Sequence, residues 1–140
     1  MKGEMYRTCV RSAMLYGSET WAMRVEDQRR MERAEMRMLR WMCGVSLAEG
    51  RTNEDVRRLV GVEPIEEVMR RGRLRWYGHV ERMGDEDWVK RCRDMEVAGK
   101  RARGRPRKTW METVKGDMTV KGLKKEDAQD RVKWRAALRL

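Results

Sequence analysis

The chain of 140 residues is strongly basic, with 34 Lys and Arg against 23 Asp and Glu and a net charge of +11. This surplus favours a polyanionic partner, which is nucleic acid or, less often, an anionic membrane face. Apolar residues make up 40% of the chain, too many for a fully disordered tail. No apolar run reaches the roughly 18 residues of a membrane span. We therefore expect a folded domain that binds nucleic acid and does not enter a membrane.

The sequence favours helix almost throughout, because it contains only two prolines and few runs of β-branched residues. The predicted fold is all-α, a small irregular bundle of five to seven helices with a basic extended segment. Helices are expected over about 3–16, 19–43, 52–60, 64–83, 86–97, 106–118 and 124–139. In terms of domains, we expect a helical domain over 1–97, a basic segment over 98–108 and C-terminal helices over 109–140.

Several boundaries carry specific end signals. Gly17 and Gly44 are suited to end helices, and Gly61 should end the short helix that starts near Thr52. Thr52 and Asp55 form an approximate capping box, since each side chain can reach the other residue's backbone N–H. Pro64 suits the first turn of the next helix because its missing N–H would be unpaired there in any case.

The helix over 64–83 has the clearest apolar stripe in the chain. Trp76 on this stripe is interpreted as a core residue, although it could stack on a base, as could Trp88. His79 is interpreted as a core or helix-contact histidine. In the last helix, Ala128, Val132 and Ala136 should point inward, with Trp134 nearby. The residues of the stripe are Ile65, Met69, Gly72, Trp76, His79 and Met83.

No pattern indicates a catalytic or metal site. Cys9, Cys43 and Cys92 are odd in number and widely spaced, and His79 is the single histidine, so no zinc pattern is present. The carboxylates show no pairing suited to acid–base chemistry. We expect reduced thiols in a nuclear or cytoplasmic protein, with no cofactor and no small-molecule substrate.

Residues 99–110 read Gly-Lys-Arg-Ala-Arg-Gly-Arg-Pro-Arg-Lys-Thr-Trp, with six basic residues and no acid. Pro106 fixes its φ angle and Gly104 has no side chain, so this backbone could lie in a narrow groove. Arg103 and Arg105 could then follow the floor of an A·T-rich minor groove, as in an AT-hook. Phosphates would be contacted by Lys100, Arg101, Arg107 and Lys108. The alternatives are a solvated linker and a basic targeting signal.

Two further sets of arginines are candidate nucleic-acid contacts. Arg71, Arg73 and Arg75 have few acidic neighbours in the sequence, which favours phosphate contact. Arg37 and Arg40 lie on one helix face with Arg30 and Arg33 and could follow a phosphate backbone. Alternatively, this second set forms i, i+4 ion pairs with Glu26 and neighbouring acids on a solvated face.

The order of short motifs resembles the C-terminal segment of reverse transcriptases from non-LTR (LINE-type) retrotransposons. The likeness runs through about residues 5–136, and the ordered set is more specific than any single block. The blocks are Leu-Tyr-Gly-Ser-Glu-Thr-Trp at 15–21, Glu-Met-Arg-Met-Leu-Arg-Trp-Met-Cys-Gly-Val-Ser at 35–46, Thr-Asn-Glu-Asp-Val at 52–56, Arg-Leu-Arg-Trp-Tyr-Gly-His-Val-Glu-Arg-Met at 73–83, Arg-Gly-Arg-Pro-Arg-Lys-Thr-Trp at 103–110 and Ala-Gln-Asp-Arg-Val-Lys-Trp-Arg at 128–135.

The resemblance implies the thumb and the region beyond it, which would hold the template–primer duplex or target DNA. The partner would be DNA, RNA or a hybrid duplex. The metal-binding aspartates of the family's palm are missing, since no Asp-Asp pair occurs in the chain. We therefore expect a non-catalytic fragment. The alternative is a helical protein-interaction module that docks on a partner, such as the missing palm domain.

Overall fold

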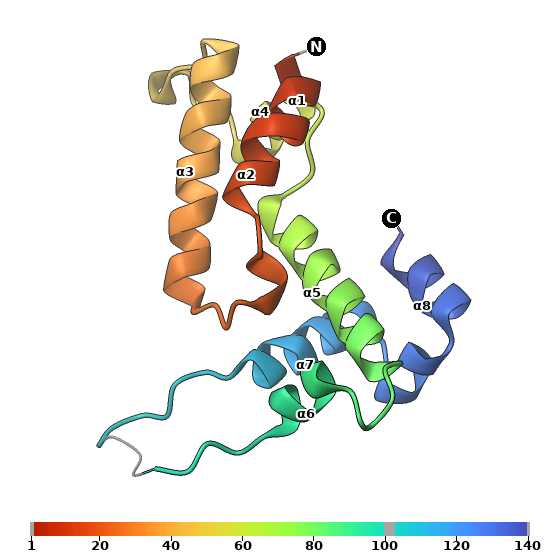
Figure 1. Cartoon of the computed structure of the whole chain (residues 1–140). Coiled ribbons are helices and arrows are strands. Elements are labelled where there is room, and N and C mark those ends of the chain that lie inside the picture. Colours follow the sequence, from red (N-terminus) through yellow and green to blue (C-terminus); the bar gives the residue numbers. More distant parts are fainter. Residues whose placement is uncertain (1, 100–102, 140) are drawn as a thin grey trace. The chain divides into compact units, whose positions relative to one another are not determined.

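The computed structural model describes residues 2–99 and 103–139, which form helices and connecting loops without any strand (Figure 1). The all-α prediction is confirmed. The first helical stretch comprises α1 (Lys2–Met5), a π-helical turn (Tyr6–Arg11) and α2 (Ser12–Met14). The other α-helices are α3 (Val25–Cys43), α4 (Asn53–Val60), α5 (Ile65–Glu81), α6 (Trp88–Asp94), α7 (Trp110–Lys121) and α8 (Arg131–Leu138). Short 3-10 turns cover Ser18–Thr20, Leu47–Glu49 and Lys125–Gln129.

The chain divides into two compact units. The first contains residues 1–18 and 23–69, and the second contains residues 19–22 and 70–140. This division differs from the expected boundaries at residues 97 and 108. The reason is that α5, α7 and α8 share one apolar core in the second unit, so the C-terminal helices are not a separate part.

The first unit is held by an apolar cluster and by precise helix ends. Gly44 adopts the left-handed conformation with φ of 66°, and the N–H of Val45 donates to the carbonyl of Arg40 at 3.0 Å. This C-terminal motif turns Val45 back onto the core, as predicted for a glycine at this position. The capping box of Thr52 and Asp55 is also confirmed. The buried cluster consists of Tyr6, Met36, Leu39, Val56 and Val62.

A buried ion pair lies beside this cluster. Glu35 is fully buried and accepts hydrogen bonds from Arg11 Nε at 3.0 Å and from the Tyr6 hydroxyl at 2.9 Å. Arg11 also donates to the carbonyl of Glu63 at 2.7 Å. Burial, reinforced by the neighbouring Glu35, raises the pKa of Tyr6 to about 12. The network joins the π-helical turn, which contains Tyr6 and Arg11, to α3 and to the loop before α5. A buried carboxylate is stable only while it keeps such partners, so the network holds these three segments together.

The second unit has its core between α5, α7 and α8. The indole of Trp134 lies almost wholly buried, and its Nε1 donates to the carbonyl of Leu74 at 2.9 Å. Gly78 makes this approach possible, since a β-carbon there would lie 2.4 Å from Trp134 Nε1. The buried members of the cluster are Leu74, Tyr77, Val114, Met118, Ala128, Trp134 and Leu138.

The expected apolar stripe of α5 is correct only in its first part. Ile65 and Met69 are buried in the first unit, but beyond them the inward face passes through Leu74, Tyr77 and Val80. Trp76 is half-buried and His79 is exposed, with their ring centroids 5.5 Å apart. The core interpretation of these two residues was therefore wrong. The face shifts because the second half of α5 packs on α7 and α8, which are distant in sequence.

The last helix also differs from its predicted register. Ala128 is buried as expected, but Val132 is 80% exposed and Ala136 is exposed. Asp130 caps α8 and accepts from the N–H groups of Val132 and Lys133. Trp134 and Leu138, four residues apart on the same face, point inward instead. Burying these two large side chains removes more apolar surface from water than burying the smaller side chains of the predicted face. None of the described helices is long and apolar enough to cross a membrane.

Candidate nucleic-acid interface

The positive charge is concentrated in one of the two units. The first unit has 12 Lys and Arg against 11 Asp and Glu, a net charge of +1. The second has 22 against 12, a net charge of +10. Such a field attracts polyanions over about a Debye length, which is about 8 Å at physiological salt. A polyanion is therefore attracted more strongly to the second unit than to the first.

The basic segment lies between α6 and α7 without regular structure and is exposed at every described residue (Figure 1). Arg103, Arg105, Arg107 and Lys108 make no ion pair with the described residues. Gly104 has φ of 119°, a conformation that other residues rarely adopt. Lys100 and Arg101, which were also predicted to contact phosphate, lie outside the described residues. The segment thus offers an extended row of four solvated cations.

The segment continues into α7 through a fixed joint. The backbone N–H of Thr109 donates to Glu112 at 2.8 Å, and the N–H of Glu112 donates to the Thr109 hydroxyl at 3.2 Å. The next residue, Trp110, is half-buried, and its Nε1 donates to the carbonyl of Glu19 at 2.8 Å. A plain linker has no need of such an anchor, and here the anchor fixes the point at which the segment ends.

The N-terminal end of the segment follows α6, which is attached to the end of α5 by charged side chains. Arg93 Nη1 donates to the buried Glu81 at 2.6 Å, and hydrogen bonds to Asp94 and Glu81 raise the pKa of the guanidinium. Lys90 Nζ donates to the carbonyl of Met83 at 3.2 Å and to Asp85 at 2.8 Å. These two cations occupy the inward side of α6 and fix it to the end of α5.

The three predicted arginines of α5 have different surroundings. Arg73 is 3% exposed, and its Nε donates to Asp117 of α7 at 2.7 Å, next to Arg70 on the same carboxylate. A guanidinium held in this way cannot reach a phosphate, so Arg73 belongs to the core and not to the interface. Arg75 is exposed, as a contact residue must be. Arg71 is half-buried and already takes part in interactions within the chain.

The arginine face of α3 belongs to the nearly neutral first unit. Arg30 forms an i, i+4 pair with Glu26 at 2.9 Å, in line with the solvated-face alternative. Arg37 is exposed. Arg40 donates to the carbonyl of Arg51 at 2.7 Å and to Asn53 at 3.2 Å, so it braces the loop before α4. Of the predicted pair, Arg37 is the more accessible.

The structure pairs Trp88, which the sequence offered as a possible base-stacking residue, with Arg91, which was not among the predicted contacts. Trp88 on α6 is 72% exposed, and the guanidinium carbon of Arg91 lies 4.7 Å from the centre of its ring. Arg91 itself is exposed. The sequence contained a signal for this pair, because residues three apart on a helix are neighbours. What could not be foreseen is that Lys90 and Arg93 would take the inward side and leave the aromatic ring in water.

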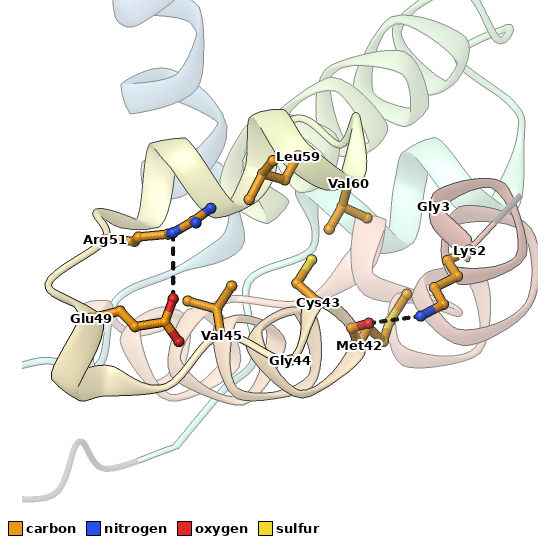
Figure 2. Close-up of a pocket in the computed structure, with 10 residues that line it drawn as sticks. All are labelled: Lys2, Gly3, Met42, Cys43, Gly44, Val45, Glu49, Arg51, Leu59 and Val60. Carbon is orange, nitrogen blue, oxygen red and sulfur yellow. Dashed lines mark hydrogen bonds and ion pairs between the residues drawn. The ribbon is translucent and has the colours of Figure 1, made fainter.

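The first unit also contains a hollow of about 610 Å³ at the end of α3 (Figure 2). Its wall includes Cys43, Val45 and Leu59. Lys2 Nζ on the rim donates to the carbonyl of Met42 at 3.2 Å, and Arg51 Nε lies 3.6 Å from a carboxylate oxygen of Glu49. The cations around the hollow are thus already engaged with the chain. Over residues 2–99 and 103–139, no three His, Cys, Asp or Glu side chains gather to hold a metal ion.

Comparison with known proteins gives one informative similarity. A Caenorhabditis elegans protein named "Putative uncharacterized transposon-derived protein F52C9.6" is 25% identical to this chain over 147 residues, which cover 96% of this chain and 53% of that protein. The chain is similar to a transposon-derived protein. It spans about half the length of this relative. No protein-family model matches the chain, and no solved structure matches it.

Proposed function

We propose that this chain is a non-catalytic nucleic-acid-binding fragment that corresponds to the thumb and post-thumb part of a non-LTR retrotransposon reverse transcriptase. It would hold template–primer duplex or target DNA while an upstream palm domain performs the chemistry. The observation that carries the proposal is the row of solvated cations at 103–108, joined at both ends to a unit of net charge +10. The ordered motifs and the similarity to a transposon-derived protein support this origin.

Binding through phosphates predicts a definite salt dependence. If about five phosphates are neutralised, the logarithm of the association constant should fall with the logarithm of salt concentration with a slope of about −4 to −5. Matched DNA, RNA and hybrid duplexes, titrated at two salt concentrations, test the proposal and identify the natural ligand. An affinity that does not change with salt would contradict it.

The role of the segment itself can be tested separately. Replacing Arg105 and Pro106 together by alanine removes one groove-directed cation and the fixed φ angle, so affinity for an A·T-rich duplex should fall. Lys115, an exposed cation on α7 of the same unit, gives a matched control as Lys115→Ala, which removes charge without touching the segment. If the double variant binds like the wild type, the segment is a linker and the groove contact is excluded.

A second candidate function rests on the surface of the first unit. Trp41 is 85% exposed on α3, and Leu47 is also exposed in the loop that follows. Exposed apolar side chains of this size support a helical protein-interaction module that docks on a partner such as the palm domain. This alternative predicts that the purified chain associates without nucleic acid, and that Arg71→Ala with Arg75→Ala changes little. Sedimentation of the free chain distinguishes the two functions.

A further inference from the structure

The outward side of α6 carries an aromatic ring that the fold does not use. Trp88 is 72% exposed, and Arg91 covers part of the ring with its guanidinium 4.7 Å from the ring centre. On the inward side, Lys90 and Arg93 bind carboxylates and carbonyl groups at the end of α5. The helix is therefore docked by its charges, and its largest apolar side chain stays in water. This reverses the usual amphipathic pattern, in which the aromatic ring is buried and the cations are solvated.

The surroundings of this ring indicate what could cover it. Trp88 belongs to the unit of net charge +10, and α6 leads directly into the exposed basic segment. A partner that lies against this surface must be anionic and must offer a flat apolar face. Nucleic-acid bases meet both requirements, because each base has a π-face beside a charged backbone. A protein partner would need a strongly acidic surface around an apolar patch.

We propose that Trp88 and Arg91 form a stacking platform for an unpaired base, so that the second unit recognises a junction between duplex and single strand. This inference rests on the proposed function and specifies its ligand. Inside a duplex, neighbouring pairs cover both faces of every base, and only an unpaired or terminal base can stack on a protein ring. A platform therefore selects the place where the duplex ends.

The length of the chain is compatible with simultaneous contact to both parts of such a junction. Seven residues lie between Met95, just after α6, and Arg103, so their Cα atoms are at most about 29 Å apart. At 3.4 Å per base pair, this is about eight base pairs of duplex. The cations of 103–108 can thus follow the duplex within one helical turn of the end where Trp88 stacks.

The test compares the affinities of four forms of the full chain for two kinds of oligonucleotide. One probe is a blunt A·T-rich DNA duplex of about 12 base pairs, and the other carries an added single-stranded overhang of about five nucleotides. The overhang is made as DNA and as RNA. The chains are the wild type, Trp88→Ala, Trp88→Phe and the control Trp41→Ala, which removes an even more exposed ring from the nearly neutral unit.

The wild type should bind the overhang probe more tightly than the blunt duplex, and Trp88→Ala should lower affinity for the overhang probe by about 5- to 150-fold, the range of one base–aromatic stack. Trp88→Phe should retain most of the affinity, and Trp41→Ala should bind like the wild type. Because Trp88 is exposed, the variant is expected to fold, and circular dichroism checks this.

Two results overturn the platform and leave the proposed function standing. One is an unchanged affinity of Trp88→Ala for the overhang probe, with the salt dependence of duplex binding retained. The other is an equal loss for Trp41→Ala, which would mean that any exposed ring contributes. If the wild type binds neither probe, both the platform and the proposed function fail.

Discussion

The close approach of Trp134 to Gly78 makes Gly78→Ala a sensitive probe of the second unit. An added β-carbon would lie 2.4 Å from Trp134 Nε1 and 2.7 Å from its Cδ1, so the indole must move. Overpacking of this kind costs about 1–3 kcal/mol. If the indole loses its bond to the Leu74 carbonyl, an unpaired buried N–H adds about 1–3 kcal/mol. The higher helix propensity of alanine offsets about 0.5–1 kcal/mol of this cost.

The expected net loss for Gly78→Ala is therefore about 2–4 kcal/mol, or a fall in melting temperature of about 10 °C or more. Circular dichroism at increasing temperature measures it. The matched control is Gly72→Ala, on the same helix, where the structure leaves open space around the new β-carbon. The free energy of unfolding of that variant should rise by about 0.5–1 kcal/mol. If both variants melt at or above the wild-type temperature, Trp134 of α8 does not pack against Gly78 of α5 as described here.

Three further predictions concern the fold and its polar contacts. Arg73→Ala should lower the free energy of unfolding by about 3 kcal/mol because it removes a buried partner of Asp117, whereas Arg75→Ala should change stability little and weaken binding to duplex DNA; urea titrations and binding assays separate the two effects. Thr109→Ala removes the cap of α7 and should cost about 1 kcal/mol in the same urea titration. The pKa of Tyr6 is raised to about 12 from its ordinary value of 10.0, so the folded state keeps this phenol protonated. The associated stability is complete below pH 10 and is lost as pH rises from 10 to 12; the urea midpoint should fall over this range, and less so for Tyr6→Phe.

Several helix ends and the extended segment could be predicted because they depend on local chemistry, whereas the helix starts expected near residues 19 and 106 lie at Val25 and Trp110. Gly44 ends α3 and Thr52 caps α4 as their residue types indicate, since both motifs use groups within five residues of one another. Residues 103–105 lie outside the helices, as expected where glycine and closely spaced cations oppose helix formation. The helical class of the fold follows from the same local preferences.

Contacts between residues that are distant in sequence could not be predicted and are known only from the tertiary structure. Arg73 looked like a phosphate contact because its acceptor, Asp117, lies 44 residues away. Trp76 and His79 were assigned to the core because periodicity alone does not decide which of two neighbouring faces of α5 is covered. The exposure of Trp88 was equally hidden, since it depends on Lys90 and Arg93 binding the end of another helix.

Local sequence thus set the helical class of this protein and several of its helix ends, such as those at Gly44 and Thr52, and also how many cations the chain carries. Only packing between distant segments decided which cations are neutralised inside and which remain in solvent. The physical reason is that a charge is buried only with a partner, and that partner can come from anywhere in the chain. The proposed interface consists of the cations for which the fold supplies no such partner.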